Sequence, residues 1–113
     1  MSGEDGMVVV SLLDDEYALR ILEETSVEPL SAKALTERCD ASPPTIYRRL
    51  DRLQDHDLVI EQQRLDPDGH HYSVYSASLE RVVIELEDGD VSVDVFLRED
   101  PADQFTKLFE ELR

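Results

Sequence analysis

One face of the segment 43–55 carries the residues whose types and spacing best suit chemistry. At about 100° per residue, a helix there would gather four polar side chains on one side: Thr45, Arg48, Arg49 and Arg52. A guanidinium group can hold a phosphate or make a bidentate contact to a guanine edge. Three arginines on one face of an acidic chain therefore indicate a contact with double-stranded DNA.

The rest of this segment allows a second interpretation. Ile46, Leu50 and Leu53 lie together on another side, where they are expected to pack inward. Asp51 and Asp55 fall outside the basic face. The arginines would then merely pair with these two aspartates on a solvated helix.

Two residues beside the basic face extend the predicted contact. Ser42 can cap the helix, with Pro43 at the first helical position, where proline is tolerated. Tyr47 flanks the arginines and can reach a base edge, a thymine methyl group or a phosphate. We include both Ser42 and Tyr47 among the candidate DNA-binding residues.

A second group of candidate contacts surrounds the turn 66–69, whose Asp-Pro-Asp-Gly composition is typical of a turn. Arg64, His70 and His71 lie around it, while the two aspartates of the turn would repel phosphate at low salt. Neighbouring histidines on a strand point to opposite faces, so His70 and His71 cannot ligate one metal ion without a bulge. We therefore expect no metal site here.

The elements that must position these residues follow one another as three helices and a hairpin. The expected helices are Asp14–Thr25, Ser31–Cys39 and Ser42–Asp55, with a short turn at Asp40–Ser42, and the expected strands are Leu58–Leu65 and His70–Ser76. Met1–Gly6 is small and polar, so we expect it to fray. The segment 1–11 is accordingly expected to be partly flexible, and 12–78 to form the DNA-binding domain.

The remaining segment, 79–113, is expected to form a second hairpin and a last helix. Around the turn Asp88-Gly89, alternation predicts three cross-strand pairs on one face: Leu86 with Val91, Ile84 with Val93, and Val82 with Val95. The helix would begin near Asp100 and carry one apolar stripe: Phe105, Leu108, Phe109 and Leu112. This apolar surface either packs on the chain's own core or forms a symmetric dimer interface, and we favour the dimer.

The length and the charge of the chain limit the class of protein to which it can belong. A chain of 113 residues supports one compact domain, and its longest apolar run is too short to cross a membrane. It has no basic segment typical of a signal peptide, so we expect a soluble cytoplasmic protein. Asp and Glu number 27 against 11 Lys and Arg, of which only Lys33 and Lys107 are lysines. Such a surface is typical of a halophile with molar internal salt, although an acidic mesophilic protein with basic partners is the alternative.

The segment from Leu30 to Val59 resembles the helix-turn-helix of the ArsR-like and MarR-like winged helix regulators, here of haloarchaeal type. The matching residues are Leu35, Ser42, Pro43, Thr45, Ile46, Arg48, Leu50, Leu53, Leu58 and Val59, and Asp57 replaces the glycine usual before the wing. The resemblance covers about residues 12–76. It implies an α+β winged helix-turn-helix fold with a three-helix core and a β-wing. It also implies that helix 43–55 enters the major groove, while the wing, 58–76, lies on the backbone or minor groove.

The function expected from these features is that of a homodimeric transcriptional regulator that needs no cofactor and is not an enzyme. Pairs of carboxylates are so frequent in this chain that none of them indicates a catalytic site. The sequence also contains no glycine-rich phosphate loop and no nucleophile motif. Potassium ions at the DNA interface would offset the acidic surface. A protein-interaction module and a ligand- or metal-responsive regulator remain alternatives. Against metal or redox sensing stands the single cysteine, Cys39.

Overall fold

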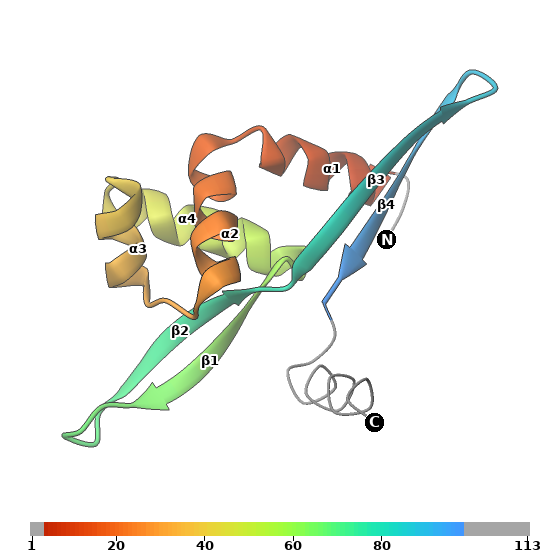
Figure 1. The fold of residues 1–113 in the computed structure, drawn as a ribbon. Coiled ribbons are helices and arrows are strands. Elements are labelled where there is room, and N and C mark those ends of the chain that lie inside the picture. The colour runs from red at the N-terminus through yellow and green to blue at the C-terminus, as the bar shows by residue number, and fades with distance from the viewer. Residues whose placement is uncertain (1–3, 99–113) are drawn as a thin grey trace, which may run out of the picture.

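The computed structural model describes residues 4–98, which form four helices and two antiparallel hairpins (Figure 1). In chain order, the elements are α1 Glu4–Leu13, α2 Glu16–Val27, α3 Ala32–Cys39, α4 Pro43–Asp55, β1 Val59–Leu65, β2 His71–Ala77, β3 Leu79–Glu87 and β4 Asp90–Leu97. We call β1–β2 the wing and β3–β4 the arm. The two hairpins project from opposite sides of the helical body (Figure 1).

The main core lies where α2, α3 and α4 meet the base of the wing. Ile21, Leu35, Ile46 and Leu50 are almost fully buried there, together with Leu58 at the start of the wing. Each such side chain stabilises the fold by roughly 1.5–3 kcal/mol, more than a surface ion pair contributes. Apolar packing therefore fixes the position of α4, and the face of α4 that was expected to pack inward is the buried one.

The helix ends follow from capping side chains. The carboxylate of Asp15 accepts the N–H groups of Tyr17 and Ala18 at 3.0 and 2.9 Å, and Ser31 accepts that of Ala34 at 3.2 Å. Ser42 caps α4 in the same way, with Pro43 at the first helical position. The three helices and two wing strands expected from the sequence are each found within two residues of their expected bounds.

A further helix, α1, precedes the helix that the sequence analysis placed first. It begins at Glu4, and its side chains Val9 and Leu12 are buried. The expectation of a frayed Met1–Gly6 is therefore corrected from Glu4 onward. The apolar residues of this segment follow one another without polar residues at helical spacing, so the sequence pattern does not predict a helix. The helix is stabilised instead by its packing on the arm.

The arm pairs in the register predicted from its sequence. Leu86 lies opposite Val91, Ile84 opposite Val93, and Val82 opposite Val95. Asp88 and Gly89 form the turn, both with positive φ, as a two-residue hairpin turn of this composition requires. Near the body, α1 packs on β4, and Val93 and Val95 are buried. The apolar stripe expected at 105–112 lies outside the described residues.

The corner between α4 and the wing is built around Asp57, which has a φ of +59°. The N–H of Asp57 donates to the carbonyl of Gln54 at 3.0 Å, and that of Leu58 donates to the carbonyl of Leu53 at 2.9 Å. This pair of bonds is a Schellman motif, which usually places glycine at the left-handed position. Asp57 therefore makes the left-handed corner at which the regulators that this segment resembles usually have glycine.

A winged helix-turn-helix is the fold that these elements define. Helices α2, α3 and α4 form the three-helix core, and the wing follows α4. The wing is tied to the body by an isolated bridge, in which Leu30 and Tyr75 exchange backbone hydrogen bonds of 3.0 and 2.8 Å. The arm and α1 are additions to this core.

Candidate nucleic-acid interface

The turn that leads into α4 depends on Asp40, which adopts a left-handed conformation with a φ of 50°. The N–H of Ala41 then donates to the carbonyl of Thr36 at 3.2 Å, closing the end of α3. Two residues later, the hydroxyl of Ser42 lies 2.9 Å from that of Thr45. Ser42 and Thr45 thus meet at the N-terminus of α4, where the helix dipole favours an anion such as phosphate.

Arg48 and Arg52 lie one turn apart on the outer side of α4, and both are exposed. Within residues 4–98, neither arginine forms an ion pair, and neither Asp51 nor Asp55 does. The interpretation in which these arginines only neutralise their helical neighbours therefore finds no support in the geometry. Both guanidinium groups are open to a phosphate or a base edge.

Arg49 is placed differently from the other two arginines of the predicted contact. Its Nε donates to the carboxylate of Asp15 at 3.0 Å, and its guanidinium lies over the ring of Tyr17, 5.9 Å from the centroid. The hydrogen bond from Arg49 is the largest factor holding the pKa of Asp15 below its ordinary value. Arg49 therefore fastens α4 to the start of α2, a role that a separation of 34 residues hides from the sequence.

A network of polar side chains connects α4 to the wing. Tyr47 is exposed on this side of α4, while Gln54 donates to Glu61 of β1 at 3.3 Å. Glu61 also accepts from Ser73 of β2 at 2.9 Å. Burial raises the pKa of the nearby Tyr75 hydroxyl, and the charge of Glu61 raises it further, so this phenol stays neutral. The network links the wing to α4 but puts an acid near Tyr47.

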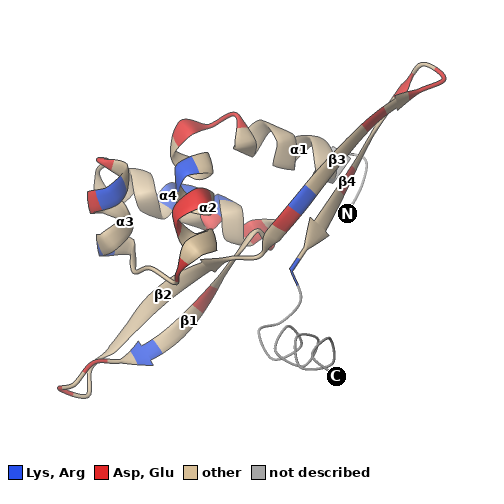
Figure 2. Ribbon diagram, in the orientation of Figure 1, with Lys and Arg blue, Asp and Glu red and all other residues tan. Residues whose placement is uncertain are grey.

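The wing tip contains the remaining candidate contacts. Arg64 lies opposite Tyr72 and is exposed, and His71 lies opposite Leu65. Asp66, Asp68 and His70 bring their ligand atoms within 4.8 Å of one another, a cluster that the sequence pattern did not predict. Asp66 uses one carboxylate oxygen to accept the N–H groups of Asp68 and His70, at 2.9 and 2.8 Å. This carboxylate therefore organises the turn. Acidic residues also occupy the turn of the arm (Figure 2).

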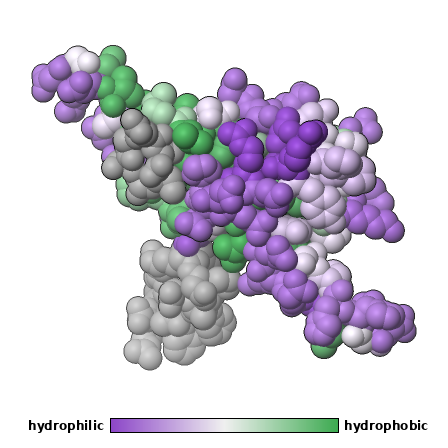
Figure 3. All heavy atoms as spheres, turned by 180° about the vertical axis from the view of Figure 1, so that it is seen from behind, coloured by the Kyte–Doolittle hydropathy of each residue, from purple (hydrophilic) through white to green (hydrophobic). Residues whose placement is uncertain are grey.

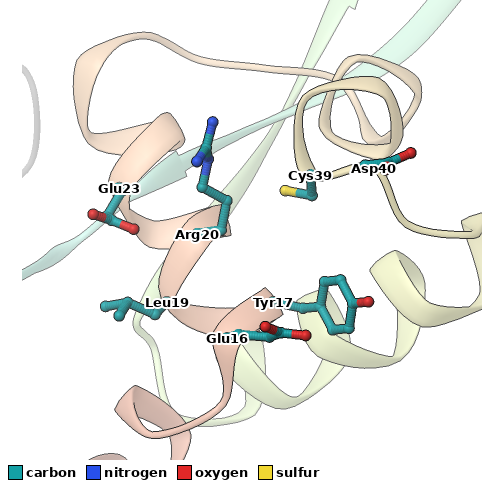
Figure 4. Close-up of a pocket in the computed structure, with 7 residues that line it drawn as sticks. All are labelled: Glu16, Tyr17, Leu19, Arg20, Glu23, Cys39 and Asp40. Carbon is teal, nitrogen blue, oxygen red and sulfur yellow. The ribbon is translucent and has the colours of Figure 1, made fainter.

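Cys39 borders a shallow open depression between α2 and α3 (Figure 4). The residues that line this depression with it are Glu16, Tyr17, Leu19, Arg20, Glu23 and Asp40. Burial raises the pKa of the Cys39 thiol, which disfavours the reactive thiolate. Redox sensing favours an exposed cysteine with a lowered pKa, and Cys39 is half-buried with a raised one.

The fold described above is that of a winged helix-turn-helix protein. In agreement, residues 13–62 match the family model described as a helix-turn-helix domain. This match spans α2, α3, α4 and the first half of β1. Among curated proteins, none matches the chain. Within residues 4–98, no helix is both long enough and apolar enough to span a membrane.

Proposed function

We propose that this protein is a sequence-specific regulator of transcription, which binds double-stranded DNA as a homodimer in high salt. In this proposal α4 enters the major groove and the wing lies along the backbone or minor groove. The observation that carries it is the pair Arg48 and Arg52, which are exposed on the outer face of α4 and form no ion pair with any other residue of the described part of the chain, 4–98. Regulators of the ArsR-like and MarR-like type in haloarchaea are the proposed relatives.

The residues proposed to contact DNA divide by task. Arg48 and Arg52 supply charge and bidentate contacts, and Ser42, Thr45 and Tyr47 supply shorter polar contacts along α4. At the wing, the proposed contacts are Arg64, His70 and His71. Arg49 stays in the proposed set through its two terminal nitrogens, because only its Nε donates to Asp15.

A net charge of -16 conflicts with ordinary DNA binding, which gains from the release of counterions. In molar salt the Debye length is only about 3 Å, so the acidic faces would be screened from the phosphates. Short-range arginine contacts then supply affinity, and potassium ions taken up between carboxylates and phosphates offset the rest. Specific binding should consequently weaken little, or even strengthen, as KCl rises.

The deciding experiment mixes the full chain with a random duplex library in about 2 M KCl, a salt that screens the acidic surface. The retained duplexes are then sequenced. We expect an enriched motif with inverted half-sites, which Arg48→Ala combined with Arg52→Ala abolishes. A matched control, Arg20→Ala combined with Arg81→Ala, removes the same charge from α2 and the arm and should retain the motif.

Two results would contradict parts of this proposal. Absence of any enriched motif from the folded protein would favour a protein-interaction module, for which the acidic surface is the supporting feature. A steep loss of specific binding between moderate and molar KCl would instead overturn only the salt mechanism.

A further inference from the structure

The outer half of the arm exposes an apolar surface. Ile84, Leu86 and Val91 are 57%, 73% and 58% exposed, although they share a face with the buried Val93 and Val95. Figure 3 shows hydrophobic residues along the arm, just behind its hydrophilic tip. A contiguous exposed row of this kind is typical of a protein interface.

The inner end of this row continues onto α1. Gly6 packs directly on Val93, and the next residue, Met7, is 53% exposed. From Met7 onward α1 is apolar nearly all around its circumference, and such a helix is usually buried on all sides. We call the four exposed residues Met7, Ile84, Leu86 and Val91 the arm patch.

The charges around the arm patch restrict what can cover it. The opposite face of the arm and the ends of its turn carry Glu85, Glu87, Asp90 and Asp94. In dilute salt these carboxylates would repel nucleic acid or an anionic membrane, and in molar salt, which screens them, the neutral apolar side chains of the patch still offer no contact to a phosphate. A basic partner would be attracted to the carboxylates themselves and would leave the apolar face open. A second copy of the chain offers an equal apolar patch and can keep every acidic face in water.

We propose that the arm patch is the surface through which two copies of this chain associate around a two-fold axis. This inference rests on the homodimer of the proposed function and locates its contact on the outer arm and the start of α1. Arm and wing project from opposite sides of the body, so association through the arm leaves both wings open (Figure 1).

Neighbouring residues on β4 provide a matched test. Val91 lies in the arm patch, whereas Ser92 points to the opposite, acidic face, and both are exposed. The full chain, Val91→Asp and Ser92→Asp are compared by sedimentation equilibrium in about 1 M KCl, where the added charge is screened. The wild type and Ser92→Asp should be dimers. Val91→Asp should weaken the dimer by roughly 100-fold or more, because it would bury an unpaired carboxylate.

A second variant, Leu86→Asp, should behave like Val91→Asp, and a circular dichroism melt shows whether each variant is folded. A monomeric wild type would overturn the proposal, as would folded patch variants that dimerise as tightly as the wild type. Binding of each variant to a single half-site duplex is measured separately. Monomers that retain half-site binding would support the inference, whereas loss of DNA binding by every dimeric form would count against the proposed function alone.

Discussion

At the scale of single residues, the tight corners of this chain use aspartate where glycine is the easier choice. Asp40, Asp57 and Asp88 all have positive φ. A left-handed conformation costs an L-residue other than glycine roughly 1 kcal/mol, and aspartate tolerates it better than most. Acidic residues therefore occupy even the left-handed positions of this chain, where the backbone conformation disfavours any side chain.

Asp57→Gly should consequently stabilise the protein. The substitution relieves the left-handed strain but keeps both backbone bonds of the Schellman motif, so we expect a gain of about 0.5–1 kcal/mol. The control is Asp55→Gly at the last residue of α4, which should lose only about 0.3 kcal/mol, because aspartate is itself a weak helix former. Thermal melts in constant molar KCl measure both changes, and a lower melting temperature for Asp57→Gly would contradict the strain argument.

Gly6 provides the opposite case, a glycine required by close packing. A β-carbon at this position would lie 2.7 Å from the Cβ of Val93. Alanine is the better helix former by roughly 1 kcal/mol, yet we expect Gly6→Ala to destabilise the fold by about 1–3 kcal/mol through overpacking. In a double-mutant cycle of chemical denaturation, Val93→Gly, which removes both the Cβ and the Cγ atoms that the new methyl group would meet, should relieve much of the penalty. Additive effects of the two substitutions would show that α1 and β4 do not meet here.

At the scale of elements, the pair Asp15–Arg49 holds α4 against the start of α2. Because the hydrogen bond from Arg49 lowers the pKa of Asp15 below 3.8, the ionised carboxylate stabilises the folded state. This contribution is fully present above about pH 4, which is the ordinary pKa of an aspartate in the unfolded chain. It is lost as the pH falls through the lowered pKa of the folded state.

Asp15→Asn should remove that contribution while keeping an oxygen for the helix cap. At neutral pH we expect a loss of about 1 kcal/mol or less, because water still reaches the pair. The difference between wild type and Asp15→Asn should shrink toward zero below pH 4. Urea unfolding across this pH range measures the difference, with Asp14→Asn as the control for a neighbouring exposed charge. A difference independent of pH would indicate a packing effect instead of the ion pair.

Local patterns made most of the elements predictable, and contacts between distant segments made the remainder unpredictable. The caps Ser31 and Ser42 and the arm register depend on neighbours in sequence, so the residue types alone predicted them correctly. The role of Arg49 depends on Asp15, which lies far away along the chain. The sequence did not predict α1, because its apolar residues do not recur at helical spacing and because their burial depends on contact with β4. Alternation predicted the apolar face of the arm, but it could not say which half of that face would be covered.

At the scale of the whole molecule, a net charge of -16 on 113 residues is the dominant property. Repulsion among these carboxylates opposes the compact state in dilute buffer, and salt screens it, because the Debye length falls from about 10 Å at 0.1 M to about 3 Å at 1 M. We therefore expect the melting temperature to rise with KCl over this range. Melts followed by circular dichroism test this, with an equal osmolality of sucrose to separate screening from general exclusion effects. A melting temperature unchanged by KCl would contradict the repulsion argument.

In the proposed dimer, the junction between the two hairpins would limit which DNA sites can be occupied. Only Ser78 separates β2 from β3, and its buried backbone and hydroxyl bond to Asp57, Leu58 and Arg98. Wing and arm are therefore joined without a flexible linker. If two arms associate, the rigid junction in each copy fixes the angle and the distance between the two wings. Half-sites displaced by half a DNA turn, about 5 base pairs, would then present the wrong face to one subunit.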